Sequence, residues 1–333
     1  MTRFITRRAS LAALGGGAAG LALPANHARA QAPRELRLGL ITPPPHTWNQ
    51  QLAAWGTRLR DASNGRFTVT LFPSGQLGNE AAMLQQLQTG ALDLSLLTVS
   101  EISNRVDAFG ALLAPFIARN IEEAVRMLRH PIALGLLNGL PQATGCVGFR
   151  YGMVGMRQIS TREVTNTLAD LRGKKVRITP AAPTRDFFNL IGMAPTPLPL
   201  PAIFEALSNG QIDGVDLDFE SIINNRFQDL CRTMLLTNHF MFPAVGLMSA
   251  RVFGTLAPAD RELIRGTMTE ALDALCDSMP EREARQGAQL RASNMQVRPT
   301  GPEFFGDAVA QFDRAWGPRA PALAQLRAAF PRG

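Results

Sequence analysis

The sequence predicts an α/β protein built on parallel sheets, and two observations lead to that prediction. Three runs with strand-like alternation, residues 35–41, 67–72 and 91–97, are separated by two stretches with helical spacing. Alternation of strand and helix over such a short span favours a parallel sheet with helical crossovers. The chain has 333 residues, which is enough for two domains of ordinary size.

The N-terminal third supports this prediction element by element. Prolines 43–45 end the first strand, and Thr47 can cap a helix that stops at Gly65. One face of that helix carries the apolar residues Trp48, Leu52, Trp55 and Leu59. A turn-rich segment, residues 73–78, follows the second strand and leads into a helix that ends at Gly90.

The remainder of the chain continues the alternation. Helices are expected over residues 121–129, 132–138, 181–192 and 201–207, and strands over 146–151, 174–179, 212–217, 233–236 and 245–249. A long helical segment begins near Pro258, and Pro280 should kink or break it. Because no low-complexity linker is present, we expect crossing strands to join the two domains.

Arg177 lies at the C-terminal end of the strand predicted over residues 174–179, which Pro180 ends. Open α/β sheets bind ligands in the crevice beyond the carboxyl ends of their strands. The guanidinium group offers a fixed fork of donors that matches a carboxylate or a phosphate. Position alone leaves two interpretations open: a ligand-binding arginine, or a surface arginine with a salt-bridge partner.

The N-terminus has the layout of an export signal. Arg7 and Arg8 precede an apolar run over residues 11–23, and Ala28-Arg29-Ala30 resembles a cleavage site. The arginine pair indicates the twin-arginine route, cleavage near Ala30 and a periplasmic protein; an uncleaved N-terminal anchor is the alternative. No later apolar run reaches the length of about 18 residues that a membrane span requires.

Composition excludes several other classes of protein. A hydrophobic content of 46% and a charged content of 18% are typical of a packed globular chain. Residues 1–30 hold four arginines and no acid, so their removal lowers the net charge from +7 to +3. That charge is small and no basic stripe with interleaved aromatic residues occurs, so we expect no nucleic-acid partner.

Residues typical of metal, redox or nucleophilic sites do not form recognisable motifs. The three cysteines are far apart and odd in number, which favours buried thiols over a single disulfide: Cys146, Cys231 and Cys276. No histidine pair has helical i, i+4 spacing and no CxxC occurs, so neither a metal nor a cofactor is expected.

The densest group of acids is Asp213, Asp216 and Asp218. One interpretation is a metal site or acid–base chemistry. The other is that these are strand-end side chains that face solvent or cap a helix beginning at Phe219.

Several motifs along residues 35–270 resemble those of the TRAP-type solute-binding proteins, the DctP family, and occur in the same order. They are FPSGQLG at 72–78, QLQTGALD at 86–93, LAPF at 113–116, GMR at 155–157, LADLRGKKVR at 168–177, PTP at 195–197, EAL at 205–207 and IDG at 212–214. The set as a whole is specific, whereas each motif alone would be weak.

The resemblance implies a two-domain α/β periplasmic binding protein of the venus-flytrap, type II-like kind, with a long helix spanning both domains. After the signal at 1–30, domain I is expected over 31–154 plus 244–283, and domain II over 155–243 plus 284–333. Such a protein captures a small organic acid and delivers it to a TRAP membrane permease, without being an enzyme. The alternatives are an extracytoplasmic ligand-sensing subunit or, using the acid group above, an exported hydrolase or lyase.

The resemblance also implies the site. Arg177 is expected to form a two-pronged salt bridge with the ligand carboxylate, and Arg157 matches the family's second arginine. The other implied positions are Glu80 and Thr98 in the cleft wall of the first domain, and His46 and Trp48 at the mouth of its first strand.

One position departs from the family pattern. Leu217, flanked by Asp216 and Asp218, stands where the family usually has an asparagine whose amide binds the carboxylate. Either the ligand is held differently, or Asp218 or its neighbour meets a polar or cationic part of it. This favours monocarboxylates with a distinct second end over simple four-carbon dicarboxylates.

Overall fold

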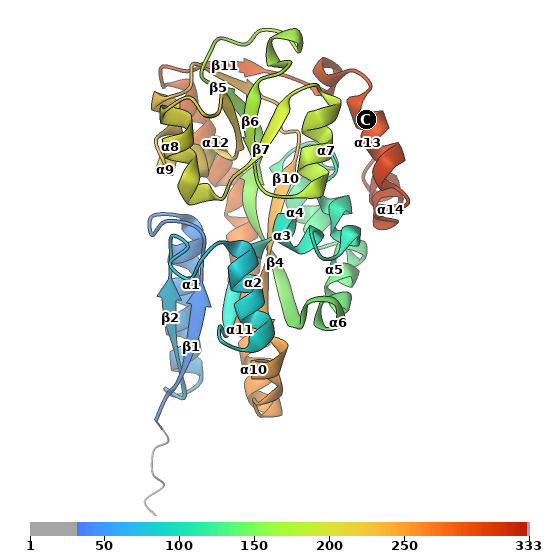
Figure 1. Ribbon diagram of the computed structural model, residues 1–333. Helices are drawn as coiled ribbons and strands as arrows, with labels where there is room; N and C mark the ends of the chain where they lie inside the picture. The colour runs from blue at the N-terminus through green and yellow to red at the C-terminus, as the bar shows by residue number, and fades with distance from the viewer. Residues whose placement is uncertain (1–31, 332–333) are drawn as a thin grey trace, which may run out of the picture. The chain divides into compact units, whose positions relative to one another are not determined.

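The computed structural model describes residues 32–331, so the predicted export signal lies outside the described residues. From Pro33 onward these residues form one compact unit that contains two β-sheets (Figure 1). A search of the described helices finds none that combines the length and apolar character needed to span a bilayer.

The first sheet has five strands, in the order β2 (Phe67–Phe72), β1 (Arg34–Gly39), β3 (Leu94–Thr98), β10 (Met241–Ser249) and β4 (Cys146–Met156). β1 pairs in parallel with both β2 and β3, as the strand–helix alternation predicted. β10 runs antiparallel to its two neighbours, β3 and β4. This sheet is therefore mixed.

The second sheet has six strands, in the order β11 (Gln296–Pro299), β9 (Thr233–Leu236), β5 (Gln158–Thr161), β8 (Gly214–Leu217), β6 (Lys175–Ile178) and β7 (Ala194–Pro197). β6 pairs in parallel with β7 and β8, and β9 pairs in parallel with β11. β5 is antiparallel to β8 and β9.

β10 in the first sheet and β5 in the second run antiparallel to their neighbours, and each follows directly on a crossing of the chain between the sheets. β4 leads from the first sheet into β5 of the second, and β9 leads from the second into β10 of the first. A strand that leaves one sheet at its carboxyl edge and enters the next at the carboxyl edge must run against its new neighbours. The crossings thus place the carboxyl ends of both sheets toward each other, where α/β sheets bind ligands.

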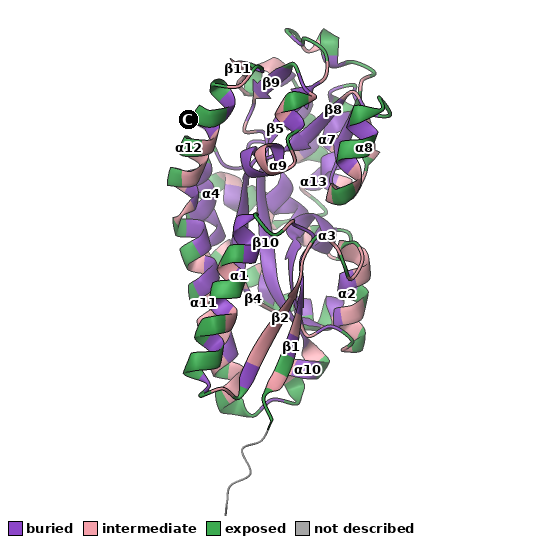
Figure 2. Ribbon diagram, turned by 90° about the vertical axis from the view of Figure 1, so that its left-hand side faces the viewer, coloured by how far each residue is buried: buried purple, intermediate pink, exposed green. Residues whose placement is uncertain are grey.

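Helices pack around both sheets (Figures 1 and 2). Their bounds are α1 Thr47–Ala62, α2 Glu80–Thr89, α3 Val99–Ser103, α4 Ile121–Leu128, α5 Pro131–Leu136, α6 Leu140–Thr144, α7 Ala182–Leu190, α8 Ile203–Ser208, α9 Phe219–Asn224, α10 Ala250–Gly254, α11 Pro258–Asp277, α12 Met279–Arg291, α13 Ala308–Trp316 and α14 Ala322–Ala329. Short 3-10 segments include η1 (Asp107–Leu113) and η4 (Leu200–Ala202).

The predicted long helix is present as two consecutive segments. α11 packs against α1 and β4 of the first sheet, whereas α12 packs against α9 and β11 on the side of the second sheet (Figure 2). The break falls at Ser278, two residues before Pro280, whose ring cannot supply the N–H that a continuous helix needs. The break predicted at this proline is confirmed.

Other differences from expectation concern the ends of elements. The strands expected at 146–151 and 245–249 are longer and extend to Met156 and back to Met241, respectively. Helix α1 is capped by His46 rather than Thr47, because the His46 ring accepts a hydrogen bond from the Trp48 amide at 3.2 Å. The expected apolar face of α1 is buried, including Trp48 and Trp55.

The last helices were not predicted, and they pack on the side of the molecule shared by η1 and α7. α13 packs against α7, and α14 packs against η1 and α5. Trp316 at the end of α13 is fully buried and lies against Gly110 of η1, where a Cβ atom would meet the indole ring. The side chain of residue 110 must therefore be absent for this helix to dock.

Candidate functional site

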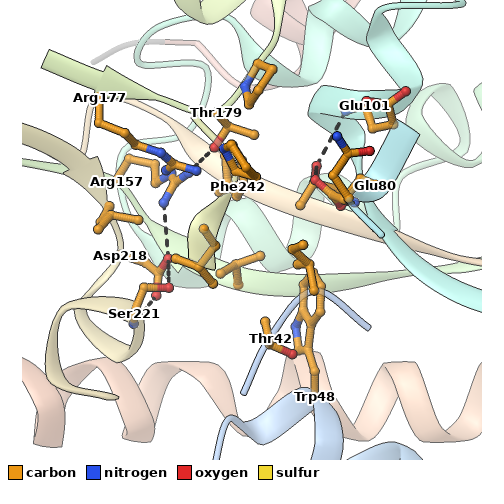
Figure 3. A pocket seen from close by; sticks show the side chains of 18 of the residues that line it. Thr42, Trp48, Glu80, Glu101, Arg157, Arg177, Thr179, Asp218, Ser221 and Phe242 are labelled. Atoms are coloured by element: carbon orange, nitrogen blue, oxygen red, sulfur yellow. Dashed lines mark hydrogen bonds and ion pairs between the residues drawn. The ribbon is translucent and has the colours of Figure 1, made fainter. Parts of the chain in front are cut away.

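A cavity of about 110 Å³ lies where the carboxyl ends of the two sheets meet (Figure 3). Both sheets and their helices contribute to its lining: Ile41, Thr42, Trp48, Asn79, Glu80, Ala81, Thr98, Glu101, Val154, Arg157, Arg177, Thr179, Pro180, Pro199, Leu200, Leu217, Asp218, Ser221 and Phe242. Among the eight residues that the sequence indicated, seven line the cavity, and His46 does not.

Arg177 is held at the end of β6 by contacts with backbone carbonyl groups. Its Nε donates to the Leu198 oxygen at 2.9 Å, and Nη1 donates to the Asp216 oxygen at 3.4 Å. None of the described residues accepts a hydrogen bond from Nη2. Burial, and then the neighbouring Arg157, lower the pKa of Arg177 to about 9, which still leaves it charged at neutral pH. Arg177 is therefore a buried cation without a directly bonded carboxylate.

Arg157 lies in the crossing between β4 and β5, and each nitrogen of its guanidinium group lies near a polar side chain. Nη1 donates to Asp218 at 3.2 Å, Nη2 donates to the Thr179 hydroxyl at 2.8 Å, and Nε lies 3.6 Å from an Asp216 oxygen. The guanidinium carbon also lies 3.6 Å from the centre of the Phe242 ring, in a cation–π arrangement. These contacts fix the orientation of Arg157 before any ligand enters.

Asp216 lies behind Arg157 and is fully buried. Its Oδ1 is 3.3 Å from Nε2 of His239. Burial acts to raise the pKa of Asp216, but the Arg157 guanidinium and then His239 outweigh it and hold the pKa below its ordinary value. Burial lowers the pKa of His239, against the opposing effect of Asp216. Asp216 is thus an ionised counter-charge for Arg157.

Asp218 is also buried and caps α9. Its Oδ1 accepts from the Ser221 amide at 2.8 Å, and its Oδ2 accepts from the Ser221 hydroxyl at 2.9 Å. The expectation that the acids cap the helix at Phe219 is confirmed for Asp218, whereas solvent exposure is wrong for both Asp216 and Asp218. Both carboxylates have protein partners, and of the two Asp218 also lines the cavity.

The third acid of the group is separate. Asp213 precedes β8, at the strand end away from the cavity, and accepts a hydrogen bond from the Lys175 amide at 2.8 Å. Over residues 32–331, no cluster of three or more His, Cys, Asp or Glu side chains is arranged to hold a metal ion. The three cysteines are free and buried, as expected.

The other end of the cavity carries two glutamates from the first sheet's side. The half-buried Glu80 accepts from the Thr98 amide at 2.7 Å and from the Thr98 hydroxyl at 2.9 Å. Burial raises the pKa of Glu80 in spite of these bonds. Glu101, in α3, is buried, and burial together with the nearby Glu80 raises its pKa to about 7. In Figure 3 both glutamates lie across the cavity from the arginines.

His46 lies behind the cavity, in a contact between the two halves of the molecule. Glu220, near the start of α9, accepts hydrogen bonds from the Thr47 amide at 2.8 Å, the Thr47 hydroxyl at 2.6 Å and Arg282 at 3.0 Å. His46 Nε2 is 3.7 Å from the same carboxylate. Burial lowers the pKa of His46, partly offset by Glu220. We call Thr47, Glu220 and Arg282 the Glu220 contact.

Sequence reasoning did not identify Glu101, Thr179, Ser221 or Phe242 as site residues. A signal for Glu101 was present, because Thr98-Val99-Ser100-Glu101 has the spacing of a helix capping box. Thr98 does cap α3, accepting from the Glu101 amide at 3.4 Å. The ring of Phe242 could not be placed, since the strand was expected to begin after it.

Two α/β halves that enclose a cavity lined by buried arginines define a two-domain solute-binding protein. The model of the family described as bacterial extracellular solute-binding protein, family 7 (DctP), matches residues 38–317. The chain therefore belongs to this family of TRAP-type solute-binding proteins, as its motifs predicted.

Known relatives match most of the chain. The sialic acid-binding periplasmic protein SiaP of Vibrio cholerae is 23% identical over 251 residues, covering 75% of this chain and 78% of SiaP. A TRAP solute-binding protein from a Bradyrhizobium species, solved with galacturonate, has a TM-score of 0.83 and 27% identity, covering 89% of this chain and 100% of the other. One from a Polaromonas species, bound to D-erythronate, has a TM-score of 0.83 and 26% identity, with 90% and 99% covered.

Proposed function

We propose that this protein is the periplasmic receptor of a TRAP transporter, which binds a small organic acid through its carboxylate and delivers it to a membrane permease. Family membership supports the class, and the acids bound by the two structural relatives support the ligand type. Export of the chain through the signal at residues 1–30, with cleavage near Ala30, is part of the proposal.

The observation that supports carboxylate binding most directly is the state of Arg177. A buried cation requires charged or hydrogen-bonding partners, and within residues 32–331 this guanidinium donates to two carbonyl oxygens and to no carboxylate. Arg157, in contrast, already has two carboxylates. A ligand carboxylate that accepts from Nη2 of Arg177 would supply the missing anion in a site shielded from water, where such pairs are strong.

Binding without turnover is supported by the acids near the arginines. A general acid or base must have a proton-accepting oxygen within reach of the substrate. Asp216 faces Arg157 and His239, and Asp218 is occupied by Ser221 and Arg157. These two acids are therefore not free to act on the ligand, and Glu80 and Glu101 lie across the cavity from the arginines that would hold the carboxylate. Family membership supports release of the acid chemically unchanged.

The test begins with the identity of the bound acid. Native mass spectrometry of protein purified from the periplasm should detect a co-purified acid, and calorimetry should then measure its affinity, with galacturonate and erythronate as comparison probes. Arg177→Ala should weaken binding by roughly thirtyfold to a thousandfold, because it removes a buried charged partner. Unchanged affinity would overturn the assignment.

A matched control separates loss of the site from loss of the fold. Arg185 lies in the following helix, is exposed and pairs with Asp186 at 3.1 Å. Arg185→Ala should bind like the wild type. Circular dichroism of the Arg177 variant should retain the wild-type spectrum. If no carboxylate binds to the folded wild-type protein, the proposed function itself is wrong.

A further inference from the structure

The cavity carries charges of opposite sign at its two ends. Arg157 and Arg177 lie on one side, and Glu80 and Glu101 lie on the other (Figure 3). The arginines act across this space, because both oppose the burial effect that raises the pKa of Glu80. The far end of a ligand held by the arginines would therefore face the two glutamates.

Glu101 has lost the backbone partner that its sequence position would normally give it. In a capping box, the acid at this position accepts from the amide of the capping residue. Here the Thr98 amide instead donates to Glu80 at 2.7 Å. Arg105 and Asn104 act on the Glu101 carboxyl group, but the Asn104 amide also donates to the Pro180 oxygen at 2.7 Å. Apart from its interaction with Asn104, this buried carboxyl group, only 7% exposed, has no hydrogen-bonding partner in the described part of the chain.

Between the charged ends, the walls are largely apolar. Leu217 stands where an asparagine was expected, and it is joined by Leu200, Val154 and Phe242. These side chains offer no hydrogen bonds to a chain of hydroxyl groups. A group the size of a water molecule needs about 10–15 Å³ of cavity volume. A cavity of about 110 Å³ therefore holds on the order of ten such groups, which limits the ligand to a short chain.

Resting on the proposed function, we infer that the ligand is a short monocarboxylate with an apolar body and an N–H or O–H donor at the end opposite its carboxylate. The carboxylate pairs with Arg177. The donor reaches the oxygens of Glu101 and Glu80, which the protein leaves without enough donors of its own. The apolar body lies against Leu217 and Phe242.

The same geometry argues against two other classes of acid. The second carboxylate of a dicarboxylate would face the carboxyl groups of Glu80 and Glu101, and above pH 7, where Glu101 is ionised, like charges placed together in a buried site weaken binding strongly. A sugar acid would bury those of its hydroxyl groups that face Leu217, Val154 and Phe242 without hydrogen bonds from these side chains, which weakens its binding relative to an acid with an apolar body.

The experiment compares straight-chain acids that differ only at the far end. The mature wild-type protein is titrated calorimetrically with ω-amino, ω-hydroxy, ω-carboxy and unsubstituted acids, from butanoate to hexanoate in length. The best donor-bearing acid should bind about tenfold or more tightly than the unsubstituted acid of the same length, and the dicarboxylate should bind about tenfold or more weakly than the donor-bearing acid. Whether the amine or the hydroxyl binds better identifies the donor.

Two variants test the residue assignment. Glu101→Gln should reduce the preference for a donor and the rejection of the dicarboxylate, while binding of the unsubstituted acid stays within about threefold of wild type. Glu262→Gln, at an exposed glutamate of α11, is the matched control and should change neither.

The outcomes separate this inference from the proposed function. A dicarboxylate that binds as tightly as the donor-bearing acids would overturn the inference, as would equal binding of the unsubstituted acid. Either result, if Arg177→Ala still weakened binding by about thirtyfold or more, would leave the proposed function intact. Failure of every acid in this series and in the comparison panel would overturn both.

Discussion

Replacing Glu220 by glutamine should weaken ligand binding although Glu220 does not line the cavity. The Glu220 contact joins Thr47, at the start of α1 beside the first sheet, to α9 beside the second. Binding proteins of this class close two halves around a ligand. We therefore expect the contact to stabilise the closed arrangement.

The magnitude follows from three hydrogen bonds that the carboxylate accepts, at 2.6, 2.8 and 3.0 Å. A hydrogen bond to a charged group contributes roughly 1 kcal/mol more than a neutral one, so a neutral amide loses about 3 kcal/mol in total. The amide is less costly to bury, which reduces the expected loss to about 2 kcal/mol. A loss of that size corresponds to about thirtyfold in affinity.

Calorimetry with the co-purified acid measures this loss, and urea unfolding measures the stability of the ligand-free variant. Glu281→Gln is the control, because Glu281 is on the same helix as Arg282, is exposed and pairs with the exposed Arg285. If Glu220→Gln lowers stability but binds the acid as tightly as the wild type, the contact exists equally in open and closed forms. The coupling to closure would then be refuted.

Three further predictions concern stability and reactivity. Burial raises the pKa of Glu283 from 4.5 to about 8, so the folded state keeps a proton that the unfolded chain loses. The unfolding free energy should therefore fall between about pH 5 and pH 8. Urea titrations of Glu283→Gln should show a smaller fall. Gly110→Ala should destabilise the protein by about 1–3 kcal/mol, because the added Cβ would lie 2.5 Å from the Trp316 ring. Gly266→Ala should instead stabilise helix α11 by about 0.5–1 kcal/mol, because no atom outside the helix's own backbone lies within 4 Å of the added Cβ. Wild-type stability of the Gly110 variant would contradict the packing argument. The three buried cysteines should react with a thiol reagent only after unfolding, and rapid labelling of the native protein would show otherwise.

The sequence predicted most accurately the features that a nearby glycine or proline determines. Pro180 and Gly173 delimit β6, so the position of Arg177 at a strand end was readable from residues within a few positions of it. Glycine and proline likewise located the ends of α2 and the break between α11 and α12. These features depend on backbone chemistry that each residue carries with it.

Features set by distant partners could not be predicted. Glu101 accepts no hydrogen bond from the Thr98 amide because that amide donates to Glu80 instead. Nothing near Glu101 in the sequence indicates this competition between the two glutamates. The roles of Asp216 and Asp218 depend on Arg157, some 60 residues earlier in the chain. Asp218 lines the cavity as the sequence indicated, but its pairing and that of Asp216 with Arg157 could not be predicted.

The position of β10 has a consequence for the order in which the protein can fold during synthesis. β10 is the only strand paired with β4 in the described part of the chain, and it also covers one edge of β3. Until residues 241–249 have left the ribosome, β4, a strand of 11 residues, has no neighbour in its sheet, and the incomplete sheet exposes unpaired backbone groups. The nascent chain must therefore be kept from aggregating until more than two thirds of it has been made, after which the first half of the molecule can be completed by its own later residues.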